Sequence, residues 1–357
     1  MKILHFIYDH INNPWVGGGG AVRVNEIYKR LYQKGHYITI FSGKYPQAVD
    51  YSEGNMHFKF IGNPRSYMAS TFSYAYEGYK QAKTLCRNYD VIIEDFAPWN
   101  PLFTYTLKNV PTILQLQNYL GKEILKKYSL TGFPFWLVEK FYPGSFKNFI
   151  IMVDCLAERY GITGNIKIIS NGIENDYLDT ATNDGAYILY LGRIDMHQKG
   201  LDTLVRAASL LPHKFSIAGQ GVDSEKLHKI ASGMDNIEFA GFISGHKKLD
   251  KISHSIALVV PSRYEGQGIV VLEAAACGKP VIVSDIPELQ YAVDAGFGIS
   301  FKTGDPDDLA LKTRLLLAND LLRKEMGRKA RDYAKNYTWD RIALDYEQFL
   351  LKVTLAP

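Results

Sequence analysis

Two glutamates, Glu265 and Glu273, lie on either side of a glycine in the stretch 262–280, which reads SRYEGQGIVVLEAAACGKP. A strand pattern (IALVVPS) precedes the turn and a helical pattern follows it, so the helix begins at the carboxyl end of a strand. Both carboxylates can then reach one extended ligand, one at the hydroxyls of a ribose and the other at a sugar. The alternative is a pair of solvated glutamates near a helix start, where the dipole favours negative charge.

The turn itself predicts an anion site. The backbone N–H groups of Gln267, Gly268 and Ile269 would open the helix, and such groups have no partner within the first turn. Glycine lets a ligand approach the backbone closely. A diphosphate fits a terminus of this kind.

Two cations occur in the stretch LGRIDMHQKGLDTL (191–204), just after another strand pattern. Arg193 and Lys199 would lie near the carboxyl end of that strand and could hold a departing diphosphate. The alternatives are a surface lysine and an arginine that forms a structural ion pair.

The elements that must position these groups are read from the alternation of strand and helix patterns along 357 residues, a length typical of two domains. Apolar runs typical of parallel strands recur in both halves. We expect an α/β protein of two Rossmann-like, doubly wound domains that face a cleft. The expected boundaries are 1–172 and 186–339 for the domains, 173–185 for a linker, and about 340–357 for a final helix.

That final helix carries an apolar stripe that needs a partner. The stripe consists of Ile342, Tyr346, Phe349, Leu350 and Val353. We expect the helix to complete the first domain.

Charge is divided unevenly along the chain. The net charge of +4 combines +7 in residues 1–170 with −3 in residues 171–357. The basic residues are dispersed and no nucleic-acid motif accompanies them, which favours an anionic substrate or membrane surface over nucleic acid. The sequence shows no membrane span or signal peptide, so we expect a cytoplasmic protein, with peripheral contact at the inner face of the membrane as a further expectation.

The motifs together resemble a known family. GRIDMHQKG (192–200), EGQGIVVLE (265–273) and ACGKPVIVSD (276–285) are similar to the retaining nucleotide-sugar glycosyltransferases of family 4, which have the GT-B fold. GGGGAVR (17–23) and QKGHYITIFSG (33–43) resemble that family's first loop and second strand. The resemblance covers most of the chain.

The resemblance implies a role for each matching position. Arg193 and Lys199 would bind the diphosphate, Glu273 the ribose, and Glu265 the donor sugar, together with the backbone of 267–269. Four glycines of the first loop would approach the donor or acceptor, namely Gly17, Gly18, Gly19 and Gly20. Their alternative is a flexible loop that requires positive φ.

The sequence departs from the family pattern after the strand 111–117. The family often has a His-Asp pair there, where this chain has Gln117 and Asn118, and neither can act as a base. Glu94 and Asp95, at another strand end, are further acceptor-side candidates. An isomerase or epimerase of sugar nucleotides would need such acid and base groups, so that function is the first alternative, followed by a non-catalytic sugar-nucleotide-binding protein.

The resemblance implies transfer of a sugar from a nucleotide diphosphate, UDP or GDP, to a hydroxyl of a glycan or lipid-linked acceptor, with retention and no cofactor. The motif DPDD (305–308) superficially suits a metal, but an aspartate followed by proline is typical of a helix N-cap. We therefore expect no metal.

An aromatic and basic stretch suggests where the acceptor binds. Residues 130–149 interleave lysines with aromatic side chains, a composition that suits a membrane interface. The aromatic residues are Phe133, Phe135, Trp136, Phe141, Tyr142 and Phe146, and the lysines are Lys140 and Lys147. The alternative is an aromatic core helix.

Overall fold

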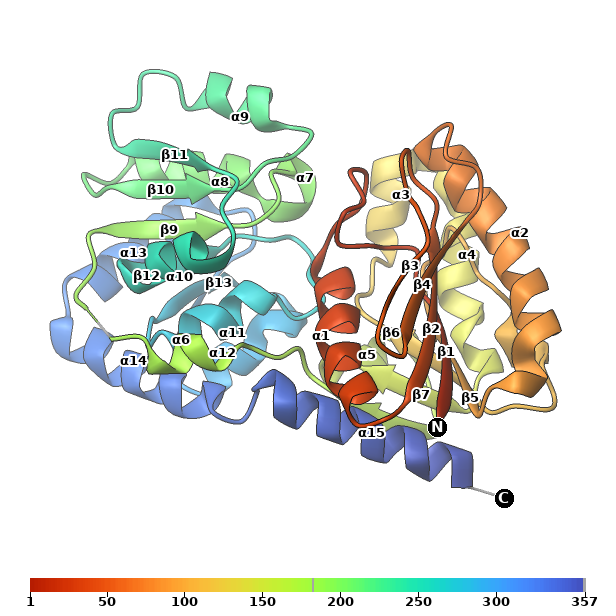
Figure 1. The fold of residues 1–357 in the computed structure, drawn as a ribbon. Coiled ribbons are helices and arrows are strands. Elements are labelled where there is room, and N and C mark those ends of the chain that lie inside the picture. The colour runs from red at the N-terminus through yellow and green to blue at the C-terminus, as the bar shows by residue number, and fades with distance from the viewer. Residues whose placement is uncertain (182, 356–357) are drawn as a thin grey trace. The chain divides into compact units, whose positions relative to one another are not determined.

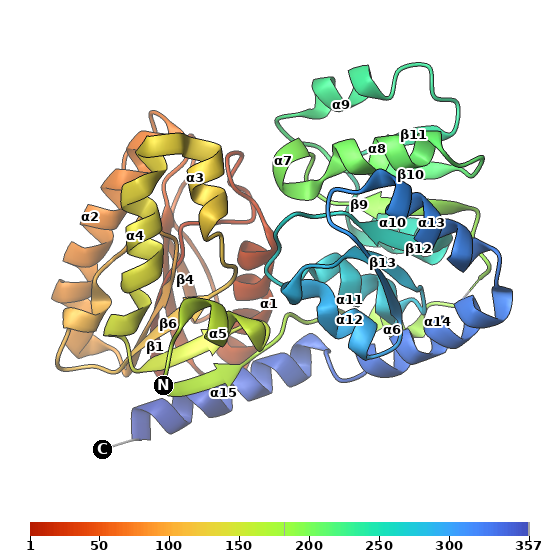
Figure 2. The ribbon, with the colours of Figure 1, turned by 180° about the vertical axis from the view of Figure 1, so that it is seen from behind.

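The computed structural model describes residues 1–181 and 183–355, and it divides the chain into two compact units. Unit 1 contains residues 1–171 and the C-terminal helix from Trp339, and unit 2 contains Gly172–Thr338. Figures 1 and 2 show each unit as a sheet with helices on both faces, which confirms the expected α/β class.

The sheet of unit 1 has eight strands in the order β3-β4-β2-β1-β5-β6-β7-β8. All pairs are parallel except β3 with β4. The strands are β1 (Lys2–Phe6), β2 (Tyr37–Gly43), β3 (Tyr51–Glu53), β4 (Met56–Ile61), β5 (Val91–Asp95), β6 (Thr112–Leu116), β7 (Asn148–Ile151) and β8 (Asn165–Ile168). The central strands are buried and rich in β-branched residues, as parallel strands covered on both faces must be.

The helices of unit 1 cover both faces of this sheet (Figure 2). They are α1 (Gly19–Gln33), α2 (Tyr67–Leu85), α3 (Lys122–Tyr128), α4 (Phe133–Phe141), α5 (Cys155–Tyr160) and α15 (Trp339–Leu355). α1 and α15 pack together, and α15 reaches β5, while α2 packs on β2 and β4. Short 3-10 turns lie at Cys86–Asn88, Thr104–Thr106, Ser129–Gly132 and Pro143–Ser145.

The C-terminal helix completes unit 1, as the apolar stripe predicted. All five stripe residues of α15 are buried. The Tyr346 hydroxyl lies 3.5 Å from that of Tyr28 on α1, and Asp340 pairs with Arg30 at 2.6 Å. The last two residues of the expected helix, 356 and 357, lie outside the described residues.

The sheet of unit 2 has six parallel strands in the order β11-β10-β9-β12-β13-β14. They are β9 (Tyr187–Leu191), β10 (Phe215–Ala218), β11 (Ile237–Gly241), β12 (Ser255–Val260), β13 (Val281–Ser284) and β14 (Gly298–Phe301). The helices are α6 (Asn175–Asp179), α7 (Met196–Lys199), α8 (Leu201–Ser209), α9 (Ser224–Ile230), α10 (Gly245–Ser253), α11 (Ile269–Ala276), α12 (Gln290–Asp294), α13 (Pro306–Leu317) and α14 (Asp320–Ala334), with a 3-10 turn at Pro287–Leu289.

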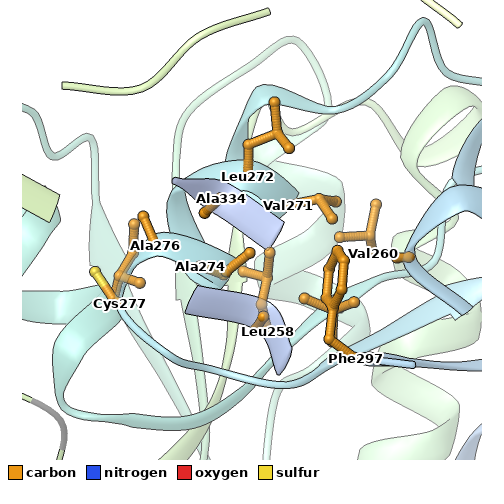
Figure 3. Close-up of a cluster of buried hydrophobic side chains, with 14 of the residues drawn as sticks. Leu258, Val260, Val271, Leu272, Ala274, Ala276, Cys277, Phe297 and Ala334 are labelled. Atoms are coloured by element: carbon orange, nitrogen blue, oxygen red, sulfur yellow. The ribbon is translucent and has the colours of Figure 1, made fainter. Parts of the chain in front are cut away.

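Helix α11 is buried on most sides in the core of unit 2. Figure 3 shows Val271 and Leu272 of this helix beside Leu258 and Val260 of β12, with Ala334 of α14 close by. A helix that is apolar all round has to be enclosed in this way. Its neighbours therefore fix the first turn of α11 in place.

The segment 173–185 differs from its expected role as a linker. Its described residues belong to unit 2, where they include α6. Ile173 is buried and pairs with Thr338 in an isolated parallel bridge. The polar composition that suggested a linker reflects surface turns around a short helix. Residue 182 of this segment lies outside the described residues.

Candidate active site

Lys199 and Glu265 form an ion pair in unit 2, although 66 residues separate them along the chain. Both side chains are largely buried. The Ser262 hydroxyl donates a second hydrogen bond to the same carboxylate oxygen at 2.9 Å. The structure thus brings together two residues that the sequence placed at one site, and it adds Ser262.

The position of Lys199 depends on an arginine that the sequence gave no reason to single out. The Arg263 guanidinium donates to the carbonyls of Met196 and His197 at 3.0 and 3.1 Å, and these carbonyls belong to the short helix that ends at Lys199. It also binds both oxygens of Asp202, at 3.0 and 2.8 Å. A planar fork can make such bonds on two sides, so Arg263 fixes this helix beside the turn after β12.

Gly200 allows the same close approach. Its φ is +61°, and a Cβ atom there would lie 2.0 Å from the carbonyl oxygen of Pro261. Any other residue would be strained and would push α7 away from the end of β12. Gly200 therefore keeps Lys199 within reach of Glu265.

Arg193 lies in the loop after β9 and does not bond to Lys199 or to a glutamate. Its Nη2 donates to the Gln198 side chain at 2.6 Å, and its carbonyl accepts from the Tyr190 hydroxyl at 2.7 Å. Because its described partner is a neutral amide, its charge is left for an anion. The same loop packs against Gly219, where a Cβ atom would lie 1.8 Å from the Gly192 carbonyl oxygen.

Glu273 projects from α11 and is only 7% exposed. Its Oε1 pairs with Lys248 of α10, while its Oε2 is buried with no hydrogen-bond partner among the described residues. A buried carboxylate oxygen without a donor is costly, so this atom is available to a ligand's hydroxyl. Lys248 was not expected from the sequence, since no motif marks it.

The helix after β12 begins later than the sequence analysis expected, so that Gln267 lies before its N-cap. Gly268 is the N-cap, with φ +77° in the left-handed region, and α11 begins at Ile269. The Gln267 carbonyl accepts from the Tyr291 hydroxyl at 3.1 Å, which fixes the turn. The first N–H groups of a helix have no partner within it and carry partial positive charge. This turn can therefore bind the anionic part of a ligand, whose hydroxyl groups could donate to Glu273.

Unit 1 has its own polar cluster, which centres on Asp95 at the carboxyl end of β5. This carboxylate accepts from Gln115 at 2.8 Å and from Gln117 at 2.7 Å, and it contacts His5 Nε2 at 3.1 Å. The other ring nitrogen of His5 lies 2.6 Å from the Tyr28 hydroxyl. We name these residues the Asp95 cluster. The sequence pointed to Asp95 and Gln117 and missed His5.

The glycines 17–20 do not form the loop with positive φ that was the alternative prediction for them. None of the four has positive φ, and α1 begins at Gly19 with Gly18 as its N-cap. A Cβ atom on Gly20 would lie 2.5 Å from the Gln117 side-chain oxygen. A side chain at position 20 would therefore displace the Gln117 amide from the Asp95 cluster.

Glu94 lies on the opposite face of the sheet from Asp95, because adjacent residues of a strand point to opposite faces. It is therefore separate from the Asp95 cluster. Its buried carboxylate accepts from Leu102 N at 2.9 Å, from Thr104 Oγ1 at 2.6 Å and from the Tyr142 hydroxyl at 2.6 Å. Burial raises its pKa, and these hydrogen bonds oppose that shift. Glu94 therefore holds the 102–104 loop, and its carboxylate is already hydrogen-bonded within unit 1.

Two other expectations can be checked locally. The Asn118 carbonyl accepts from the Tyr160 hydroxyl at 2.6 Å, which fixes its backbone.

The Asp305 side chain caps α13 by accepting from Asp307 N and Asp308 N, both at 3.1 Å, which confirms that DPDD is an N-cap. Among the described residues, no helix is long and apolar enough to cross a membrane.

Comparison with solved structures identifies the class of fold. The chain matches sucrose-phosphate synthase from Thermosynechococcus elongatus with a TM-score of 0.81 and 21% identity, over 99% of this chain and 98% of that one. It matches HepE from Anabaena, solved in complex with UDP-glucose, with a TM-score of 0.73 and 15% identity, over 99% and 100%. The protein has the GT-B fold of glycosyltransferases.

The sequence of unit 2 resembles a known family of glycosyltransferases. Residues 179–333 match the family model of glycosyl transferases group 1. An uncharacterized glycosyltransferase of Methanocaldococcus jannaschii is 27% identical over 363 residues, which cover 96% of this chain and 97% of that protein. In this domain the chain is similar to the glycosyl transferases group 1 family.

Proposed function

We propose that this protein is a retaining glycosyltransferase that moves a sugar from UDP or GDP to a hydroxyl acceptor. The observation that supports the proposal most is the ion pair of Lys199 with Glu265 in the same unit as the first turn of α11. A cation, a fixed carboxylate and a helix N-terminus are the groups that a diphosphate-linked sugar needs. HepE, with the same fold, is described in complex with UDP-glucose.

Each residue has a distinct role in the proposed reaction. Lys199 and Arg193 stabilise the charge that develops on the departing diphosphate. Glu265 binds the donor sugar, and the free oxygen of Glu273 accepts from a ribose hydroxyl. The bond between the anomeric carbon and the diphosphate breaks, the acceptor oxygen bonds to that carbon on the same face, and its proton passes to the departing phosphate.

No metal or cofactor enters this proposal. The positive charge that a metal would supply to the diphosphate comes from two side chains and the N-terminus of α11. Activity should therefore persist in the presence of a chelator such as EDTA. Loss of turnover on chelation, with recovery on addition of Mn²⁺ or Mg²⁺, would contradict this part of the proposal.

We propose a lipid-linked or cell-surface glycan as the acceptor, on the basis of a surface on α2 and the neighbouring segment 126–141. Exposed apolar residues follow α2 at helical spacing, namely Met68, Phe72 and Tyr76. Phe72 stacks on Phe135 of α4, with ring centroids 6.5 Å apart. The segment adds exposed Leu130, Phe133 and Phe141. We call this the α2–α4 surface.

Lysines on this surface have the placement of residues at a lipid interface. Lys140 lies over the rings of Trp136 and Phe141, at 5.3 and 5.2 Å from their centroids, and Lys127 lies 5.6 Å from the ring of Tyr128. Such side chains can keep their ammonium groups among anionic head groups while the rings enter the interface. Two residues of the stretch, Tyr142 and Phe146, are buried in the core, but both follow the end of α4 at Phe141.

The donor part of the proposal is tested with a panel of UDP-, GDP- and ADP-linked sugars. We expect slow nucleotide release from one UDP or GDP sugar, and an NMR spectrum in which the transferred sugar keeps the anomeric configuration of the donor. Conversion of the donor to an epimer without nucleotide release would support the isomerase alternative. An inverted anomer would contradict retention.

The acceptor part is tested by co-sedimentation with vesicles of phosphatidylglycerol and phosphatidylcholine at low salt. We expect the parent to bind and Phe72→Ser/Leu130→Ser to bind at least fivefold more weakly. Leu321→Ser, which removes an exposed leucine of unit 2, is the matched control. Equal binding of all three proteins, or efficient transfer to a soluble acceptor without vesicle binding, would contradict a membrane acceptor.

A further inference from the structure

A polar cavity lies in unit 2, at the other end of α11 from the candidate active site. Its volume is about 450 Å³, and it is bounded by α14, by the turn 278–280 and by residues 183–184. The eight residues of α11 rise by about 12 Å, so its first turn is well separated from this cavity. The candidate catalytic residues do not line it. We call it the α14 cavity.

The floor of the α14 cavity is formed by two glycines in close contact. A Cβ atom on Gly327 would lie 2.4 Å from the carbonyl oxygen of Gly278, so α14 can approach the turn only with glycine at 327. Residues of α14 at spacings of three and four then face the cavity, as one side of a helix does. The cavity is thus a consequence of tight helix packing and does not depend on one flexible side chain.

Cations dominate the lining. They are Lys279, Arg323, Lys324, Arg328 and Arg331, against three acidic residues, Asp184, Asp320 and Asp332. Two of the acidic residues already pair with arginines of the same wall, Asp320 with Arg323 and Asp332 with Arg328. The side chains that line the cavity therefore carry a net positive charge.

Three of these cations, Lys279, Lys324 and Arg331, have no carboxylate within ion-pair distance in the described part of the chain. Lys279 is 2% exposed and donates to the Asn183 carbonyl at 2.7 Å. Arg331 donates through Nε to the Ala276 carbonyl at 3.1 Å and through Nη2 to that of Thr180. Burial lowers the pKa of Lys279 to about 8, and Arg331 acts in the same direction, while the nearby Cys277 and Asp184 act against the shift. A buried ammonium beside a second cation favours binding of an anion.

We infer that the α14 cavity binds a small phosphate monoester, with the phosphate group between Lys279 and Arg331 and with Lys324 at the rim. An arginine fork matches phosphate oxygens, and a lysine adds a point charge. The volume falls within the range of small-molecule sites and leaves room for the organic part of the ligand. The α14 cavity is separate from the proposed donor site, so this inference does not depend on the proposed function.

Calorimetric titration with inorganic phosphate and with glycerol 3-phosphate at pH 7 and low salt tests the inference. We expect saturable binding of both, with the monoester at least as tight. Lys279→Met and Lys324→Gln should each weaken binding by about tenfold, as loss of a charged hydrogen bond does. Lys226→Gln, which removes an exposed lysine of α9, should have no effect.

A donor-site variant separates this site from the proposed active site. Lys199→Ala should bind glycerol 3-phosphate as the parent does, and Lys279→Met should bind nucleotide as the parent does. If Lys279→Met does not fold, Lys324→Gln supplies the same comparison, because its side chain is exposed.

The pH dependence gives an independent readout. Because the pKa of Lys279 is lowered to about 8, the ammonium loses its proton between pH 7 and 9, and phosphate affinity should fall over that range. In Lys279→Arg the charge persists, so the fall should be reduced. Absence of saturable phosphate binding would overturn the inference. So would binding that survives both Lys279→Met and Lys324→Gln and disappears in Lys199→Ala.

Discussion

Lys199 and Glu265 meet as an ion pair because the chain brings the ends of β9 and β12, two adjacent strands, to one edge of the unit 2 sheet. Arg263 holds α7 and Gly200 lets it approach the turn after β12. The carboxylate also accepts from Ser262. A substrate anion that enters this site must therefore compete with an existing, ordered partner for the charge of Lys199.

Glu273→Ala should weaken nucleotide binding by roughly 1.5 to 3 kcal/mol, because the unpartnered Oε2 is the acceptor that we assign to a ribose hydroxyl. Such a bond is present in both ground and transition states, so the rate at saturation should change less than the affinity. Calorimetry with UDP and GDP measures the effect. Lys251→Gln on the same α10 helix as Lys248, where Lys251 pairs with the exposed Glu238, is the control. Unchanged affinity in Glu273→Ala would refute the role.

Gly20→Ala should destabilise unit 1 by about 1 to 3 kcal/mol, because its methyl group would overlap the Gln117 amide that bonds to Asp95. Truncation of the obstructing side chain in Gly20→Ala/Gln117→Ala should recover part of the loss. Gly18→Ala meets only Asp9, at 3.7 Å, and is the control. Urea unfolding of the four proteins tests the coupling, and purely additive effects would contradict the proposed overlap.

Glu94→Ala should lower the free energy of unfolding by about 3 kcal/mol, because it leaves buried N–H and hydroxyl donors of the 102–104 loop and Tyr142 without an acceptor. The folded fraction should keep the parent's affinity for acceptor. A stable Glu94→Ala protein that loses acceptor affinity would restore Glu94 to the acceptor side.

Acid should weaken the folded state through His10. This residue is buried among aromatic rings, and burial lowers its pKa from 6.5 to about 4. The folded state then binds the proton less well than the unfolded state, so stability is full above pH 6.5 and falls as the pH drops toward 4, by up to about 3 kcal/mol. Urea unfolding at pH 7 and pH 5 should show a smaller loss in His10→Gln than in the parent. Equal losses would count against this assignment.

The sequence allowed the fold to be predicted because buried parallel strands and amphipathic helices leave strong patterns. The stripe from Ile342 to Val353 also predicted a partner for the last helix. The motifs placed Lys199 and Glu265 at one site, since each follows a strand and the carboxyl ends of parallel strands share an edge.

Other features depend on tertiary contacts that no local pattern records. The alternation of strand residues puts Glu94 and Asp95 on opposite faces of the sheet. It does not show that the 102–104 loop covers the face of Glu94 and donates to its carboxylate. Lys248 reaches Glu273 from a separate helix, and His5 of β1 reaches Asp95 of the neighbouring strand β5. The glycines 17–20 suggested a loop, whereas two of them begin α1, and the contact of Gly20 with Gln117 is one that no local pattern records.

The central claim, that Lys199 stabilises a departing diphosphate, is tested most directly by the single-turnover rate of Lys199→Ala at saturating donor. The donor is the nucleotide sugar found active in the panel, and Lys226→Gln is the matched control. We predict a rate at least on the order of 10² lower in Lys199→Ala, as loss of a transition-state charge contact typically gives, and an unchanged rate in the control. A Lys199→Ala protein that turns over at the parent's rate once saturated would contradict the assignment of this site.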